Sequence, residues 1–161
     1  MAYRFEHWSN IDSFIYFGHY RLTIPPPSWV NQAHRNGARI LGTLIFEWED
    51  GARECKDMLD GKVTYEGKMV DDDLGALFYA EKLVEIARVF KFDGYLINFE
   101  SNIPQSYVEL ALQFLEYLKM RLHDDVGPHA ELVWYDSVLA TTGEVRWQSA
   151  LRENNKDFFD V

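Results

Sequence analysis

Two polar side chains stand two positions apart in a segment that is otherwise apolar and aromatic. They are Asn98 and Glu100 in the stretch FDGYLINFES, which has the composition of a buried β-strand. Because side chains alternate along a strand, both face the same side, about 6.5–7 Å apart along the backbone. The other side carries Tyr95, Ile97 and Phe99. Two interpretations stay open: a carboxamide and a carboxyl that meet one substrate, or a buried polar pair that satisfies itself by hydrogen bonding.

The first interpretation fits the hydrolysis of one kind of sugar. Most glycosidases use two carboxyl groups, one as acid and base and the other as nucleophile or base. An asparagine in the place of one carboxylate suggests a substrate that supplies its own nucleophile. A 2-acetamido sugar does so when its amide oxygen closes an oxazolinium ring on the anomeric carbon. The enzyme then needs one group to orient the acetamide and one acid/base, and Asn98 and Glu100 fit these roles.

The other predicted strands also end in side chains that can do chemistry. The strand predicted over residues 11–19 ends at His19, and the strand over residues 38–48 ends at Glu47 and Trp48. In parallel β-α folds, functional side chains gather where the strands end. Ionised groups at buried strand ends cost free energy unless they are partnered or needed. The strand over residues 130–138 carries four more candidates: Trp134, Tyr135, Asp136 and Ser137.

Strand and helix patterns alternate along the whole chain. This order favours parallel β-α units, and we expect the α/β class, a partial (β/α)8 TIM barrel with about four strand-helix units. A small doubly wound sheet is the alternative. A complete barrel needs eight units and about 250 residues. Helices are predicted over residues 28–36, 49–60, 71–91, 104–123 and 145–155. The first has Ser28 as its N-cap and ends at Gly37. An exposed connection is expected over 61–73, and the approach to another strand at 158–161.

Composition limits the classes of partner. The chain has 161 residues, with 26 acidic against 16 basic side chains and a formal net charge of -10, so we expect no nucleic acid. The single cysteine, Cys55, excludes an internal disulfide framework. The first residues lack the apolar stretch of a signal peptide, and no run reaches the roughly 18 apolar residues of a membrane span. We expect a soluble, cytosolic protein with no membrane partner.

Four long segments, in order along nearly the whole chain, resemble the cytosolic endo-β-N-acetylglucosaminidases of glycoside hydrolase family eighty-five. They are HWSNIDSFIYFGHYRLTIPP (residues 7–26), WVNQAHRNGARILGTLIFEW (29–48), FKFDGYLINFES (90–101) and LVWYDSVLATTGEVRWQSALRENNKDFFD (132–160). The resemblance implies a mannosyl-glycoprotein endo-β-N-acetylglucosaminidase. Such an enzyme hydrolyses the β-1,4 bond of the di-N-acetylchitobiose core of N-glycans, by a retaining, substrate-assisted mechanism, with no cofactor and no metal. The implied partner is an N-glycan or glycopeptide.

The resemblance also implies roles for single residues. Asn98 handles the acetamido group, Glu100 protonates the leaving oxygen and then activates water, and Tyr135 hydrogen-bonds near the reacting sugar. Trp147 matches an aromatic residue associated with the acceptor-side sugar. The remaining predicted substrate-binding residues are Trp48, Glu47, His19, Asp136 and Trp134.

The resemblance covers the second to fifth strands of the barrel. We therefore expect residues 1–161 to be a single fragment of a catalytic TIM-barrel domain, with the remainder of the barrel in the full-length protein. Half a barrel exposes open sheet edges and unmatched apolar faces. The sequence thus predicts that this polypeptide alone folds poorly or is inactive.

Three other hypotheses remain open at the level of sequence. His19, Glu47, Glu100 and Asp136 could form a metal-hydrolase site, although no paired-histidine spacing supports it. Glu47 or Asp136 could act as a conventional glycosidase nucleophile. The chain could also be a catalytically inactive, truncated fragment or a lectin-like remnant that binds glycans without cleaving them.

Overall fold

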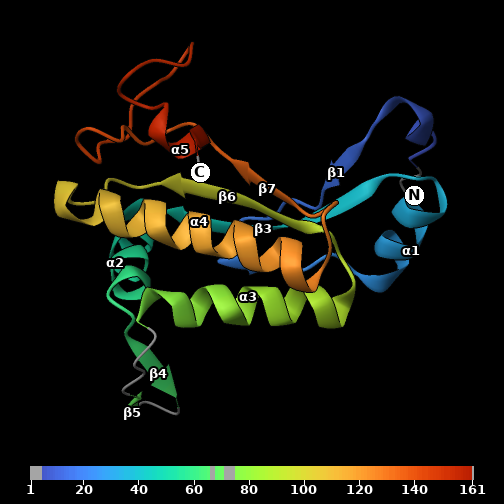
Figure 1. Ribbon diagram of the computed structural model, residues 1–161, viewed down its shortest axis with the longest axis horizontal. Coiled ribbons are helices and arrows are strands. Elements are labelled where there is room, and N and C mark those ends of the chain that lie inside the picture. The colour runs from blue at the N-terminus through green and yellow to red at the C-terminus, as the bar shows by residue number, and fades with distance from the viewer. Residues whose placement is uncertain (1–4, 66–67, 71–74, 161) are drawn as a thin grey trace.

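The computed structural model describes residues 5–65, 68–70 and 75–160. Four parallel strands form its main sheet in the order β1-β3-β6-β7, which confirms the prediction of a parallel β-α half-barrel (Figure 1). Their bounds are Ser13–Ile15, Arg39–Glu47, Gly94–Glu100 and Glu131–Trp134. The carboxyl ends of β3 and β6 point to the left of Figure 1. The helices are α1 (Pro27–Arg35), α2 (Trp48–Leu59), α3 (Ala76–Phe90), α4 (Val108–Asp125) and α5 (Asp157–Asp160), with 3-10 turns η1 (Trp8–Asn10) and η2 (Gln105–Tyr107).

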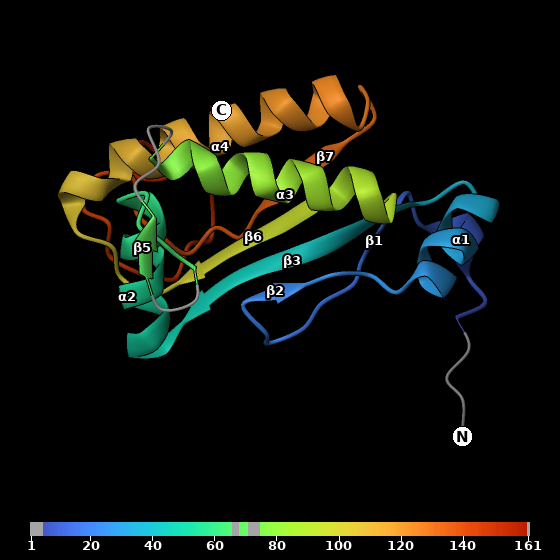
Figure 2. The same cartoon turned by 90° about the horizontal axis from the view of Figure 1, so that it is seen from below.

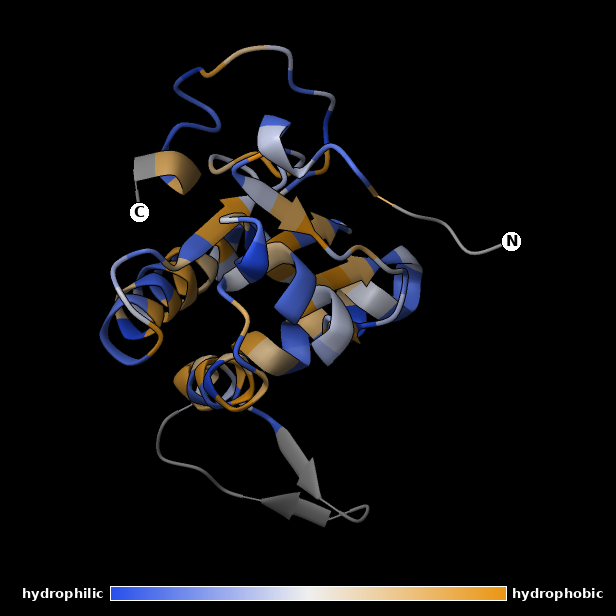
Figure 3. Cartoon of the chain, turned by 90° about the vertical axis from the view of Figure 1, so that its right-hand side faces the viewer, coloured by the Kyte–Doolittle hydropathy of each residue, from blue (hydrophilic) through white to orange (hydrophobic). Residues whose placement is uncertain are grey.

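Helices α3 and α4 lie side by side over one face of β3 and β6 (Figure 2). The strands of the main sheet are largely hydrophobic, whereas the helices alternate hydrophobic and hydrophilic stretches (Figure 3). Arg121 of α4 and the Tyr117 hydroxyl hydrogen-bond to Glu81 of α3 and hold the pKa of this carboxyl below its usual value. The core between sheet and helices includes Ile40, Leu44, Phe46, Tyr95, Ile97, Phe99, Leu83, Val84, Phe114, Leu115 and Leu118.

A buried tyrosine ties α3 to the central strand. The Tyr95 ring is fully buried on the helix side of β6, and its hydroxyl donates to the Leu83 carbonyl oxygen at 2.7 Å. Burial raises the pKa of Tyr95, so the phenol stays protonated and keeps this hydrogen bond. The side of β6 that was predicted to be apolar is therefore the side that meets the helices.

The ends of α1 follow from local backbone chemistry, with one correction. Pro27 is the first helical residue and Pro26 the N-cap, so the prediction of Ser28 as N-cap was wrong. Gly37, with φ 75°, ends the helix as predicted. The Gly37 and Ala38 amides donate to the carbonyl oxygens of His34 and Ala33, which is the hydrogen-bond pattern of a Schellman cap.

The first predicted strand, residues 11–19, is shorter than expected and is followed by a strand that the pattern did not predict. β1 ends at Ile15, and after a loop the chain returns as β2 (Leu22–Thr23), which pairs antiparallel with β3. The Tyr16 amide donates to Leu41, and the Ile45 amide donates to the Arg21 carbonyl oxygen. Both segments thus line the same edge of β3, one along each half.

Three further segments differ from the sequence-based expectations. The connection over 61–73 contains the antiparallel pair β4 (Val63–Tyr65) and β5 (Lys68–Val70), and residues 71–74, the predicted start of α3, lie outside the described residues. No helix forms over 145–155, because tertiary contacts hold it: Val145 forms a bridge with Val138, and the Arg146 amide donates to Ser137. The C-terminal segment ends in α5, which overturns the expected approach to a strand.

The amino ends of the strands are tied together across a glycine. Gly94 has φ 138°, and a Cβ there would lie 1.9 Å from the Glu131 carbonyl oxygen. The missing side chain leaves room beside β6, and Arg39 of β3 forms a 2.7 Å ion pair with Glu131 of β7. Ser13 of β1 donates to the same carboxylate. One carboxylate therefore joins β1, β3 and β7 at the end of the sheet opposite Glu100.

None of the helices within residues 5–65, 68–70 and 75–160 is both long and apolar enough to cross a bilayer.

We predict that Gly94→Ala destabilises the protein by about 3 kcal/mol or more, since it adds a backbone clash to left-handed strain. Gly37→Ala is the matched control: its φ is also positive, but nothing lies within 4 Å of an added Cβ. We expect it to lower the free energy of unfolding by only about 1 kcal/mol. Urea unfolding of both variants of the full-length protein gives the comparison, and equal losses would contradict the close contact at Gly94.

Candidate active site

The carboxyl ends of β3 and β6 bring predicted site residues side by side. The two strands pair in register, with Ile45 opposite Asn98 and Glu47 opposite Glu100. Adjacent strands lie about 4.8 Å apart, so the two carboxyl groups project from neighbouring positions. Tyr95, Ile97 and Phe99 all belong to the helix-side core, which leaves Asn98 and Glu100 on the opposite, lumen-facing side of β6.

Asn98 is buried with an unused hydrogen-bond acceptor. Its side chain is 2% exposed, and its Oδ1 has no hydrogen-bond partner within the described residues. No hydrogen bond joins it to Glu100 in that part of the chain, so the interpretation as a self-satisfied polar pair finds no support. An unsatisfied buried acceptor costs about 1–3 kcal/mol, so this oxygen is an exception to the usual pairing of buried polar groups.

Glu100 opens onto a pocket of about 460 Å³ that also contains three other predicted site residues. The Glu100 side chain is exposed, and within the described residues its carboxylate forms no hydrogen bond or ion pair. Tyr135 and Asp136 come from the end of β7, and Trp147, 92% exposed, comes from the segment beyond it. The rest of the lining is Ser137, Val145, Arg146 and Gln148.

The residues after β7 are fixed to the end of β6 and to the C-terminal segment. The Tyr135 amide donates to Ile97 O at 3.0 Å, and the Ser137 hydroxyl donates to Phe99 O. Asp136 Oδ2 accepts from Asn155 Nδ2 at 2.7 Å, and Asn155 is fully buried. The sequence analysis missed Asn155, because nothing in its neighbourhood marks a buried carboxamide. Asp136 is thus oriented by a group 19 positions along the chain.

His19 and Glu47 form a pair at the same edge. His19 Nδ1 lies 3.1 Å from both carboxylate oxygens of Glu47, whose side chain is 12% exposed. His19 sits on the loop between β1 and β2, so the strand missing from the sequence-based prediction helps to position it. Glu47, in register with Glu100, is therefore partnered on the side away from β6.

Trp48 has a strained backbone. Its φ is 62°, in the left-handed region that bulky residues rarely adopt, and its side chain is 83% exposed. This conformation costs roughly 1–2 kcal/mol and persists only where the surroundings enforce it. Such strain is common at functional sites. No sequence signal predicts it, because tryptophan is not a residue type that favours positive φ.

Five predicted site residues do not line this pocket: His19, Glu47, Trp48, Asn98 and Trp134. Trp134 alone among them is turned into the helix-side core. Its ring stacks on Phe158 of α5 at 4.5 Å and meets the edge of Phe99 at 5.3 Å. The alternation along β7 places it on the helix side with Leu132, where it lines a small pocket beside α4. Trp134 therefore supports the strand that carries Tyr135.

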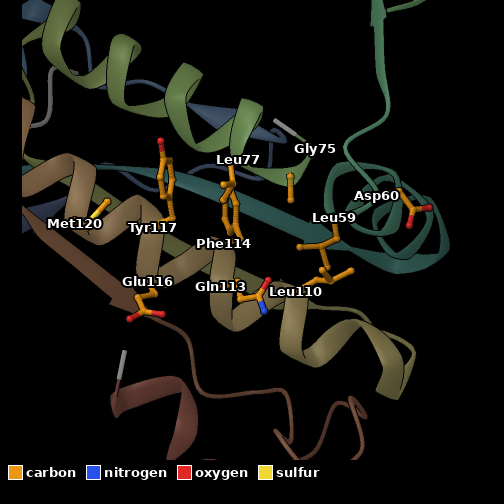
Figure 4. A pocket seen from close by; sticks show the side chains of 11 residues that line it. Leu59, Asp60, Gly75, Leu77, Leu110, Gln113, Phe114, Glu116, Tyr117 and Met120 are labelled. Atoms are coloured by element: carbon orange, nitrogen blue, oxygen red, sulfur yellow. The ribbon is translucent and has the colours of Figure 1, made fainter. Parts of the chain in front are cut away.

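A larger hollow lies elsewhere and contains none of the predicted residues. Figure 4 shows this hollow of about 660 Å³ among α2, α3 and α4, with Leu77, Phe114 and Tyr117 in its wall. This hollow lies within the helical layer and not at the carboxyl ends of β3 and β6. Among the described residues, no group of three or more His, Cys, Asp or Glu side chains is arranged to hold a metal ion. His19, Glu47, Glu100 and Asp136 do not form a ligand set.

Comparison with known proteins gives one consistent family. Residues 1–161 match the family described as Glycosyl hydrolase family 85. The chain is 42% identical over 98% of its length to the cytosolic endo-beta-N-acetylglucosaminidase of Mus musculus, and 43% identical over 96% to cytosolic endo-beta-N-acetylglucosaminidase 2 of Arabidopsis thaliana. It spans 20% of the length of each of these curated relatives.

A solved structure agrees with this family. The glycoside hydrolase domain of Endo-D from Streptococcus pneumoniae R6 superposes with a TM-score of 0.71 at 26% identity. The match covers 94% of this chain and 22% of that one.

We predict that Trp48→Gly is more stable than Trp48→Ala by about 1 kcal/mol, because glycine adopts a positive φ without the steric penalty that alanine retains. Both variants remove the same exposed indole, so the difference isolates the backbone. Urea unfolding midpoints of the two proteins measure it. An alanine variant at least as stable as the glycine variant would mean that Trp48 is not left-handed in solution.

Proposed function

Because the chain belongs to glycosyl hydrolase family 85, we propose that it carries the catalytic residues of an endo-β-N-acetylglucosaminidase. The proposed substrate is the di-N-acetylchitobiose core of N-glycans, cut at its β-1,4 bond. The observation that carries the proposal is the pair on β6: Asn98 is buried with a free acceptor, and Glu100, on the same face, opens onto a pocket. An acetamido sugar has the N–H that Asn98 can accept, and its carbonyl oxygen can replace the second carboxylate as nucleophile.

The proposed reaction has two steps and retains configuration. In the first, Asn98 Oδ1 accepts a hydrogen bond from the acetamido N–H and turns the acetamido carbonyl oxygen toward the anomeric carbon. That oxygen attacks C1, the bond from C1 to the leaving oxygen breaks, and Glu100 gives its proton to the leaving oxygen. In the second, Glu100 takes a proton from water, the water oxygen bonds to C1, and the oxazolinium ring opens.

The surrounding residues have supporting roles in this proposal. Tyr135, which lines the pocket with Glu100, hydrogen-bonds near the reacting sugar, and Trp147 offers a stacking face to the acceptor-side sugar. Asp136, oriented by Asn155, and the His19–Glu47 pair contact glycan hydroxyls along the carboxyl edge. Trp48 adds a second exposed aromatic surface. We leave Trp134 out of the contacting set, because its ring packs against Phe99 and Phe158.

The proposal includes a compartment and a class of partner. The relatives are named cytosolic enzymes, and the chain has an acidic composition with a single buried cysteine. Burial raises the pKa of the Cys55 thiol to about 12, which keeps it protonated and unreactive. We infer action in the cytosol on N-glycans or glycopeptides, without a cofactor and with no nucleic acid or membrane as partner.

The main test is Glu100→Gln in the full-length protein. Loss of the acid/base proton is expected to lower kcat for release of glycan from a high-mannose glycopeptide by about 10³-fold or more, since both steps need it. Mass spectrometry of the released glycan measures the rate. Glu47→Gln is the matched control on the neighbouring strand, and we expect a smaller loss. Wild-type rates in Glu100→Gln would refute the proposed role. A covalent glycosyl-Glu47 adduct would instead make Glu47 the nucleophile.

A second test concerns Asn98. Its replacement by alanine is expected to lower kcat by about 10²- to 10³-fold, the size seen when one group that stabilises a transition state is removed. KM is expected to change much less, because most of the glycan is held by other residues. A thiazoline mimic of the oxazoline should inhibit the wild-type protein and lose affinity for Asn98→Ala. If kcat is unchanged, or if the variant loses only affinity for glycan, substrate assistance through Asn98 is wrong.

A further inference from the structure

The chain turns from strand to helix within one residue at the end of β3. Glu47 is extended, with φ -119° and ψ 151°, Trp48 has φ 62°, and α2 begins at once. A sharp turn of this kind between strand and helix exposes the side chain at its apex above the edge of the sheet. Trp48 is at that apex and is 83% exposed. The turn therefore exposes an aromatic residue one position after Glu47, which pairs in register with Glu100.

A hydroxyl just beyond the end of β6 holds this turn. Ser101 Oγ lies 2.9 Å from the carbonyl oxygen of Trp48 and 3.2 Å from that of Phe46, and its single hydrogen is shared between the two acceptors. Ser101 is only 7% exposed, and its contact with the Phe46 carbonyl oxygen is buried. It directly follows Glu100, the last residue of β6. The backbone of Trp48 is thus fastened to the strand that presents the acid/base candidate.

A glycine makes the contact sterically possible. A Cβ on Gly51, in the first turn of α2, would lie 2.8 Å from the backbone carbon of Phe46 and 3.3 Å from Ser101 Oγ. With any larger residue the helix would have to move away from the end of β3. Gly51 thus lets the first turn of α2 lie against β3 and Ser101, next to the Trp48 carbonyl that Ser101 bonds.

We propose that Ser101 is a positioning residue that fixes the Trp48 ring relative to the Glu100 carboxyl, so that both meet one oligosaccharide. The ligand class for the Trp48 ring is the apolar face of a pyranose, which stacks on exposed indole. This inference rests on the proposed glycosidase function. It assigns Ser101 no contact with substrate: the serine acts through Trp48, by holding its backbone in a conformation that the residue does not favour by itself.

The test is a double-mutant cycle in the full-length protein, with glycan release from a high-mannose glycopeptide as the readout. Ser101→Ala is expected to raise KM about tenfold, the equivalent of one lost hydrogen bond, with kcat changed much less. Ser101→Thr keeps the hydroxyl and should restore KM. In the Trp48→Ala background, Ser101→Ala should have no further effect on KM, because the ring it positions is gone. A role in folding alone would change the unfolding midpoint but not this pattern.

The possible outcomes distinguish the positioning role of Ser101 from the proposed glycosidase function. If the wild-type protein cleaves the glycopeptide but the KM effects of Ser101→Ala and Trp48→Ala multiply, or if Ser101→Thr fails to restore KM, the positioning role is wrong and the proposed function stands. If the wild-type protein does not cleave, both fall. Should Ser101→Ala not fold, Ser101→Cys, which has a similar size and a much weaker donor, takes its place in the same cycle with the same expected results.

Discussion

The in-register pairing of β3 with β6 is the constraint on which the other features depend. Six consecutive Cα pairs run from Gly42 and Tyr95 to Glu47 and Glu100, and this register decides which side chains meet at the carboxyl edge. A slip of one residue would turn Asn98 and Glu100 toward the helices and Phe99 toward the lumen. The slip is prevented by the core, because Tyr95, Ile97 and Phe99 are fully buried among helix side chains.

The sequence was informative where burial and periodicity agree. β3 and β6 are apolar on nearly every position, so the polar exceptions Asn98 and Glu100 stand out, and alternation alone assigns them to one face. The parallel order followed from the spacing of strand and helix patterns. The same reasoning was unable to find β2, whose two residues form a strand only because the edge of β3 lies beside them. It also predicted a helix over 145–155, where the bridge between Val138 and Val145 prevails.

The site residues divide in the same way. Residue type and place at a strand end made Glu47, Glu100 and Tyr135 candidates, and the structure places all three at the carboxyl edge of the sheet. Asn155 and Ser101 were not found because their roles depend on what they contact. Asn155 orients Asp136 from 19 positions away. Ser101 donates to the Phe46 carbonyl oxygen of β3 and to that of Trp48 in α2. Trp134 was placed in the site by its neighbours in sequence, whereas the pleat of β7 turns it toward Phe158.

The two ends of the sheet have different functions. At the amino end, the carboxylate of Glu131 binds both Ser13 and Arg39 beside Gly94 and holds the strands together. Strands β1, β3 and β7 are thus joined at their amino ends by contacts that involve no residue of the Glu100 pocket. The opposite rim is therefore free to vary in loop length and residue type without loosening the frame. Substitutions at the rim therefore leave the contacts of Glu131 with Ser13 and Arg39 in place.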